Sequence, residues 1–178
     1  MKPSIALLAV SCCAALWTPA ARAFTVSSSS LRADGSFAAA QAYDLHGCGG
    51  ANVSPALRWT QSPPGTRGFA LTMFDRDARG GLGWWHWVVV DLPAGTRALA
   101  AGAALPAGAR VWRNSYGQDA YGGPCPPRGD RAHHYVLTVY ALPDARMRLP
   151  RGDDAAQVAA ALQAAALGTA QLVGTYAR

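Results

Sequence analysis

A run of glycine and proline between residues 121 and 129 restricts most strongly what this chain can fold into. The run reads Tyr-Gly-Gly-Pro-Cys-Pro-Pro-Arg-Gly. Glycine is entropically costly in regular structure and proline lacks a backbone donor, so neither a helix nor a central strand can include this run. The apolar segment 135–142 that follows is typical of a buried strand. The pattern predicts a rigid loop that brings His133 and His134 to the rim of a sheet, where binding sites are frequent.

The first 23 residues have the pattern of a secretory signal. Lys2 gives a positive start, residues 5–17 are apolar, and residues 21–23 read Ala-Arg-Ala, which fits a cleavage site. The apolar run is too short to span a bilayer. A lipoprotein signal acylated at Cys12 is the alternative, although residues 9–11 match such signals poorly. We expect cleavage near Ala23, a periplasmic or secreted location, and one domain over residues 24–178.

The mature chain would carry a modest positive charge. Cleavage removes Lys2 and Arg22 and lowers the formal net charge from +6 to +4. The remaining arginines are scattered along the sequence and form no basic tract. We therefore expect no nucleic-acid partner and at most peripheral contact with a membrane surface.

Strand patterns bounded by glycine, proline and aspartate predict a mostly β fold. Candidate strands cover residues 24–27, 69–74, 85–92, 111–112 and 135–142. One helix is expected from Ala155 to Leu167, with Asp153 or Asp154 as N-cap and Gly168 as the stop. Residues 171–176 are compatible with a returning edge strand. The expected fold is therefore packed antiparallel β-sheets with a C-terminal α-helix.

Two cysteines, Cys48 and Cys125, remain after cleavage, and each lies in a glycine-rich segment. An even pair in an exported chain suggests a disulfide, which would tie the two loops together. Two free thiols are the alternative.

Ionisable side chains gather at the ends of the predicted strands. Asp75 and Asp77 follow one strand, and His133 precedes another. Within the strand 85–92, alternation places His86 on the face of Val88, which predicts a partly buried imidazole. A buried histidine alone is more often structural, but protonated imidazoles can bind an anion, and carboxylates can fix their tautomers. Backbone N–H groups of residues 122 and 123 would supply further donors.

Four segments together make the chain resemble the phosphatidylethanolamine-binding protein family, in its bacterial Raf-kinase-inhibitor-like branch. They are residues 52–59, 75–78, 85–90 and 121–135, they follow the family's order, and they extend over nearly all of the mature chain. The resemblance implies antiparallel sheets, a C-terminal helix and a small anion pocket at one end.

The resemblance also implies the residues of that pocket. They match Asp75, Asp77, His86, Pro127, His133 and Tyr135. His133 rather than His134 is the match, because the family pattern His-Arg-Tyr here reads His-His-Tyr. The family usually has Asp-Pro-Asp-Ala-Pro where this chain has Arg76 and Arg79 in place of the prolines. This departure favours a less rigid loop and a more basic rim.

We expect an exported, non-catalytic protein that binds phosphate head groups or similar small anions and needs no cofactor. A protein-interaction or inhibitor role is the alternative, with the partner unknown. A hydrolase is less favoured, because Ser54 and Ser115 lie outside a Gly-x-Ser-x-Gly elbow. A metal site at Asp75, His86 and His133 would lack the usual short-spaced ligand pair, so no metal is expected.

Overall fold

The structure is a computed structural model that describes residues 23–149, 152 and 154–178. The predicted signal segment, apart from Ala23, lies outside the described residues, as does the alternative N-cap Asp153. Within the described part of the chain, no helix has the length and hydrophobicity needed to cross a membrane.

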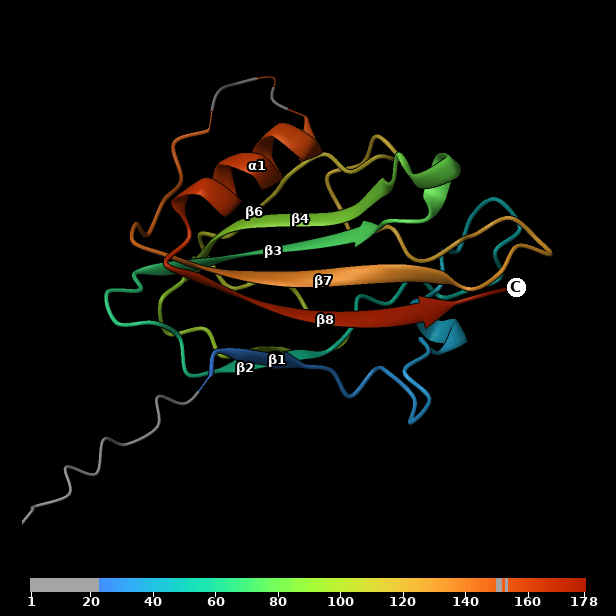
Figure 1. The fold of residues 1–178 in the computed structure, drawn as a ribbon, viewed down its shortest axis with the longest axis horizontal. Coiled ribbons are helices and arrows are strands. Elements are labelled where there is room, and N and C mark those ends of the chain that lie inside the picture. Colours follow the sequence, from blue (N-terminus) through green and yellow to red (C-terminus); the bar gives the residue numbers. More distant parts are fainter. Residues whose placement is uncertain (1–22, 150–151, 153) are drawn as a thin grey trace, which may run out of the picture.

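Two antiparallel sheets and one helix form three layers (Figure 1). The larger sheet has the strand order β6-β4-β3-β7-β8, with β3 at Gly68–Asp75, β4 at Trp84–Pro93, β6 at Arg110–Val111, β7 at His133–Leu142 and β8 at Gly168–Tyr176. The smaller sheet has the order β1-β2-β5, with β1 at Thr25–Ser27, β2 at Leu57–Thr60 and β5 at Ala98–Leu99. The helix α1 spans Ala155–Ala165, and two short 3-10 turns lie at η1 (Ala39–Gln41) and η2 (Ala78–Gly81). The predicted fold class is confirmed.

The larger sheet is covered on both faces, which explains why its central strands are buried along nearly their whole length. Val158 and Leu162 of α1 pack with Val88 and Val90 on one face. On the other face, the smaller sheet contributes residues such as Trp59 to a second apolar cluster. This double covering fixes the central strands β3, β4 and β7, whose ends carry the candidate site.

The helix begins as the sequence predicts. The Asp154 side chain accepts a hydrogen bond from the Gln157 backbone N–H at 2.8 Å, and the Gln157 side chain accepts one from the Asp154 N–H at 2.9 Å. This reciprocal capping box stabilises the first turn. The predicted end at Leu167 is wrong, because the backbone is already extended at Ala166 and Gly168 opens β8. β8 confirms the expected edge strand.

Short strands were the elements that the sequence pattern placed least well. β2 and β5 were not predicted as strands, and β6 ends at Val111 instead of Trp112. β7 begins at His133, so both His133 and His134 belong to the strand rather than to the loop before it. Pairing with β8, from His133 opposite Tyr176 onward, extends the strand into this region.

Candidate functional site

A pocket of about 270 Å³ lies at one end of the larger sheet, where β3 ends and β4 and β7 begin. It receives five of the six predicted site residues, namely Asp75, Asp77, His86, Pro127 and His133. They come from β3, from the turn after it, from β4, from the proline-rich loop and from β7. The fold therefore brings together side chains that are far apart in the sequence, and their role as ligand contacts stays a prediction.

Asp75 and His133 form a buried pair. Asp75 stands opposite Tyr135 in the β3–β7 ladder, so His133 is its diagonal neighbour on the same face. Asp75 Oδ2 lies 2.7 Å from His133 Nδ1, and both residues are buried. Asp75 Oδ1 accepts hydrogen bonds from the backbone N–H groups of Asp77 (2.9 Å) and Ala78 (3.1 Å). One carboxylate thus orients an imidazole and shapes the turn η2.

Asp77 is directed toward β7. Its Oδ2 accepts a hydrogen bond from the His134 backbone N–H at 2.7 Å and lies 2.7 Å from His134 Nδ1. Its Oδ1 lies 3.4 Å from Arg131 Nη2. Burial would raise the pKa of Asp77, but the His134 hydrogen bonds and the nearby Arg131 charge outweigh it and lower this pKa overall. Asp77 is therefore an ionised carboxylate whose charge is largely compensated.

A β-bulge turns His86 toward the pocket. Trp87 pairs with Met73 and Trp85 pairs with Phe74, so His86 is the extra residue on β4. Such a bulge shifts the alternation of side chains between the two faces. His86 packs edge-on against Tyr135 at 5.1 Å between ring centres, and Tyr135 belongs to the cluster that the smaller sheet covers. The predicted sharing of a face with Val88 is therefore wrong.

His86 is neutral at neutral pH. Its Nδ1 lies 2.6 Å from the Gly122 carbonyl oxygen. A carbonyl only accepts, so Nδ1 carries the hydrogen and Nε2 is left as an acceptor. Burial lowers the pKa of His86 from 6.5 to about 4, although the Gly122 hydrogen bond and the Asp75 charge oppose this shift. Since the unfolded imidazole binds a proton more readily than the folded one, acid weakens the fold at this residue as pH falls from about 6.5 toward 4.

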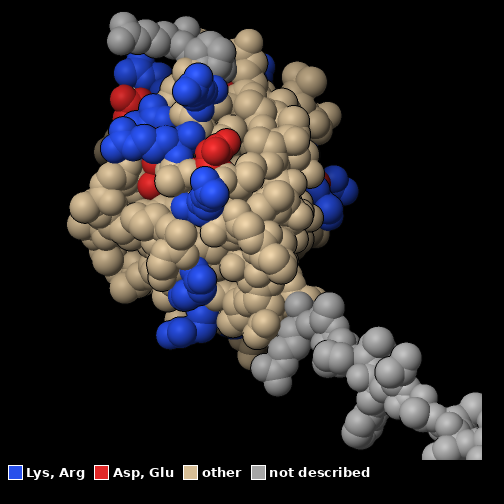
Figure 2. Space-filling model, turned by 90° about the vertical axis from the view of Figure 1, so that its left-hand side faces the viewer, with Lys and Arg blue, Asp and Glu red and all other residues tan. Residues whose placement is uncertain are grey.

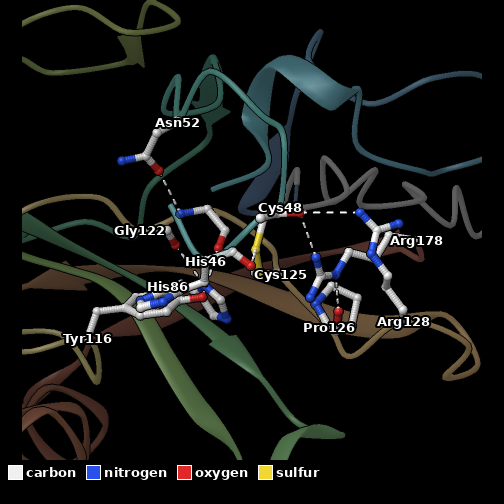
Figure 3. The surroundings of a disulfide bond; sticks show 12 residues. His46, Cys48, Asn52, His86, Tyr116, Gly122, Cys125, Pro126, Arg128 and Arg178 are labelled. Carbon is white, nitrogen blue, oxygen red and sulfur yellow. Dashed lines mark hydrogen bonds between the residues drawn. A yellow bond between two sulfur atoms is a disulfide. The ribbon is translucent and has the colours of Figure 1, made fainter. Parts of the chain in front are cut away.

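The glycine- and proline-rich loop that holds His86 is fastened to a second loop (Figure 3). Cys125 and Cys48 form a disulfide with a Cα–Cα distance of 5.5 Å, within the range of such bonds. Asn52 Oδ1 accepts a hydrogen bond from the Gly123 N–H at 2.8 Å, and Asn52 Nδ2 donates to the Tyr121 carbonyl at 3.2 Å. The Gly122 carbonyl group that accepts the His86 hydrogen bond is therefore positioned by the disulfide and by the two Asn52 hydrogen bonds.

Two arginine side chains hold these two loops together by hydrogen bonds to backbone carbonyl groups. Arg178, at the C-terminal end of the sequence, donates from Nε to the Pro126 carbonyl and from Nη1 to the Gly47 carbonyl at 2.9 Å. Arg128 Nη2 approaches the same Gly47 carbonyl at 3.4 Å (Figure 3). Both guanidinium groups are thereby used to hold loop backbone together, next to the disulfide.

The wall also contains Arg79, which the sequence analysis expected at a basic rim, but sequence reasoning missed Gly80, Trp84, Tyr116 and Asp130. Tyr116 donates to the Gly123 carbonyl at 3.2 Å and stacks on Tyr43 at 4.3 Å between ring centres. It lies in a turn-rich segment without strand or helix periodicity, so only tertiary packing reveals it. Asp130 Oδ2 lies 3.5 Å from His133 Nε2, on the open side of the buried pair.

The predicted site residue Tyr135 lies behind the pocket rather than on its wall. It is fully buried against His86 and Phe37. Its hydroxyl group makes no hydrogen bond of good geometry with a described residue, and the Asp75 carboxylate is the nearby polar group that acts on it. Burial, together with the Asp75 charge, raises the pKa of Tyr135, so the hydroxyl group keeps its hydrogen at physiological pH. A direct contact between Tyr135 and a ligand stays a prediction.

The two serines considered for a hydrolase do not line the pocket. Ser115 Oγ instead accepts a hydrogen bond from the Trp85 N–H at 2.9 Å, and Ser54 is buried elsewhere. Among the residues that the structure describes, no three His, Cys, Asp or Glu side chains are arranged to hold a metal ion.

Arginine side chains gather at the end of the molecule away from the pocket (Figure 2). Arg110, Arg146 and Arg148 line a shallow groove there together with Asp91 and Asp144. Arg110 Nε lies 2.6 Å from Asp91 Oδ2, whereas the exposed Arg146 and Arg148 form no ion pair with a described residue. The basic character of the chain is therefore not concentrated at the candidate site.

Comparison with known proteins agrees with this architecture. The model of the family described as phosphatidylethanolamine-binding protein matches residues 27–177. YbcL from Escherichia coli is 38% identical over 162 residues, which cover 88% of each chain. LppC from Mycobacterium tuberculosis, a protein named as a lipoprotein, is 46% identical over 129 residues, which cover 72% of this chain and 62% of LppC. The crystal structure of YbcL, titled as a member of the mammalian PEBP family, superimposes with a TM-score of 0.81 at 37% identity, covering 87% of this chain and 98% of that one.

Proposed function

We propose that this chain, which belongs to the phosphatidylethanolamine-binding protein family, binds small phosphate-bearing anions in the pocket beside Asp75 without transforming them. The observation that carries the proposal is the convergence of His86, His133 and Asp75 on one pocket. The family takes its name from a phospholipid with a phosphate-bearing head group, which supports a phosphate ligand. A binding role is further supported because no serine, threonine or free thiol lines the pocket in the described residues.

Proton uptake by the protein should strengthen anion binding in such a pocket. Three carboxylates line it, and His86 is neutral at neutral pH. A phosphate that still carries a hydroxyl hydrogen can donate it to His86 Nε2, whereas sulfate has no hydrogen to donate near neutral pH. When His86 takes up a proton, Nε2 becomes a donor and attracts either anion. Phosphate should therefore bind better than sulfate at neutral pH, and the difference should shrink in acid.

Acidification is expected to strengthen sulfate binding by up to about tenfold per pH unit for each proton taken up with the anion. The gain in sulfate affinity should grow as the pH falls from the ordinary pKa of histidine toward the lowered pKa of His86, because the bound anion favours the protonated imidazole. Isothermal calorimetry with sulfate and inorganic phosphate, from about pH 7 to about pH 5, measures it. Sulfate keeps its charge over this range, so the pH dependence of sulfate binding reflects protonation of protein side chains alone.

Histidine variants identify those groups. His86→Gln and His133→Gln should each weaken binding by about tenfold or more, since hydrogen bonds to charged groups contribute about 1.5 to 3 kcal/mol. His134→Gln is the matched control on the same strand, because His134 faces Asp77 and does not line the pocket. Binding that is independent of pH, or that survives loss of both His86 and His133, would contradict the proposed site.

We infer that the protein acts outside the cytoplasm, with a mature chain that begins at Phe24. The signal-like pattern of residues 1–23 supports export. A disulfide between Cys48 and Cys125 is typical of oxidising compartments, and one relative is named as a lipoprotein.

Expression of the full chain in a Gram-negative bacterium tests the export proposal. The intact mass of the periplasmic protein should correspond to residues 24–178, and non-reducing digestion should yield one peptide pair linked through Cys48 and Cys125. Ala23→Arg, which removes the small residue before the expected cut, should abolish cleavage. A mass with a lipid on Cys12, or an uncleaved chain in the cytoplasm, would refute the assignment.

A further inference from the structure

We infer that Arg79 is the specificity-determining residue of this pocket and makes it selective for terminal phosphates, as in inorganic phosphate and phosphomonoesters, over phosphodiesters. This inference rests on the proposed phosphate-binding function and adds the class of phosphate. It follows from the charges around the pocket, from the freedom of the Arg79 guanidinium, and from the backbone that presents it.

Arg79 is the one permanently charged cation among the described residues that line the pocket. Three arginines of the neighbouring loops have other partners. Arg131 approaches Asp77, and Arg128 and Arg178 donate to loop carbonyl groups. The grouped arginines of Figure 2 lie at the other end of the molecule. A fixed positive charge for a pocket ligand can therefore come from Arg79 alone among the described wall residues.

The Arg79 side chain is exposed and forms no hydrogen bond or ion pair with any described residue. Asp75 and Asp77, the closest carboxylates in sequence, are already used by His133 and by His134. A guanidinium group without a carboxylate partner keeps its donors available, and its planar fork matches two oxygens of one phosphate.

The turn η2 presents Arg79 in an uncommon backbone conformation. Arg79 has φ 53° and ψ 39°, in the left-handed region that non-glycine residues rarely adopt. The turn is fixed at its start by the Asp75 carboxylate and closed by the hydrogen bond from the Gly83 N–H to the Ala78 carbonyl at 3.0 Å. The group that orients His133 thus also determines where Arg79 leaves the backbone, beside the pocket.

Selectivity for a terminal phosphate follows from two contacts made together. A phosphomonoester has three terminal oxygens and, near neutral pH, carries up to two negative charges or one charge and a hydroxyl hydrogen. It can offer two oxygens to Arg79 and still present a third to His86 Nε2, the acceptor left by the Gly122 hydrogen bond. A phosphodiester has two such oxygens, a single charge and no hydrogen to donate. The monoester therefore gains more from Arg79 and His86 acting together.

Calorimetry at neutral pH with phosphoethanolamine and glycerophosphoethanolamine tests the inference. The two compounds share the amine. Phosphoethanolamine is a phosphomonoester, whereas glycerophosphoethanolamine is a phosphodiester, like the head group of a phospholipid. The wild-type protein should bind phosphoethanolamine about tenfold or more tightly than the diester. Arg79→Asn should remove most of this preference, and Arg79→Lys should retain part of it. Asparagine tolerates the left-handed backbone, so the variant should fold.

Arg76→Asn is the matched control, because Arg76 belongs to the same loop but does not line the pocket. It should leave both affinities close to wild type. If the wild-type protein binds phosphoethanolamine but prefers the diester, or if Arg79→Asn keeps the monoester preference, the role of Arg79 is refuted while the proposed function stands. If the wild-type protein binds neither compound nor inorganic phosphate, the proposed function fails and this inference fails with it.

Discussion

Replacing both Cys48 and Cys125 by serine is expected to lower the free energy of unfolding by about 4 to 5 kcal/mol, as a loop-entropy upper figure. The disulfide joins residues separated by 77 positions, so it removes many conformations from the unfolded chain. It also fastens the loop that carries Gly122 to the loop that carries Asn52, and both of these residues help to position His86. The double variant should therefore be less stable than the wild-type protein, and it should also bind anions less tightly.

Equilibrium unfolding in urea measures this loss, with intact mass and thiol titration as checks on the oxidation state. Wild-type protein unfolded with a dithiol reductant should reach the same lowered stability as the double variant, and the reductant should leave the variant unchanged. Equal stability of the oxidised wild type and the double variant would show that the hydrogen bonds around the loops suffice without the covalent link.

Much of the fold could be predicted because its strands carry local signals. The central strands β3, β4 and β7 are long apolar runs that end at Asp75, Pro93 and Leu142. The capping box at Asp154 marks the helix start. Of the smaller sheet, β1 was predicted, but β2 and β5 were missed because they pair over a few residues only, so their formation depends on distant partners such as Leu99 opposite Leu57. Short strands of this kind leave little periodicity in the sequence.

The candidate site was predictable in its residue types and less so in its geometry. His86 could be singled out, but its face could not, since the bulge opposite Met73 and Phe74 is a property of two paired strands. The pairing of Asp75 with His133 likewise follows from the register of β3 against β7. Tyr116 lies in a turn, where neither the period of two nor that of 3.6 residues applies, so nothing in the sequence pattern marked it.

Gly123→Ala is expected to destabilise the protein by about 3 kcal/mol or more, at the upper end of overpacking effects. A Cβ atom at this position would lie 2.1 Å from the Gln41 carbonyl oxygen and 2.6 Å from the Tyr43 nitrogen. Both are backbone atoms, so no rotamer change relieves the clash. The segment around Ala42 cannot move away either, because the Ala42 backbone is in equally close contact with Gly50. The loop must therefore move as a whole.

Two other glycines separate this steric effect from the general cost of adding a methyl group. A Cβ atom on Gly95 meets nothing within 4 Å, so Gly95→Ala should leave the free energy of unfolding nearly unchanged. On Gly122 it would meet the Tyr116 ring at 2.5 Å, and since a side chain can shift further than the backbone at Gln41, the loss should be intermediate. Urea unfolding should show the largest loss of stability for Gly123→Ala, a smaller loss for Gly122→Ala and the smallest for Gly95→Ala. A Gly123→Ala protein as stable as Gly95→Ala would mean that the loops at Gln41 and Gly123 are packed less closely than the structure has them. Anion binding measured on the folded fraction of Gly123→Ala should fall as well, because displacing residue 123 moves the adjacent carbonyl that fixes the hydrogen on His86 Nδ1.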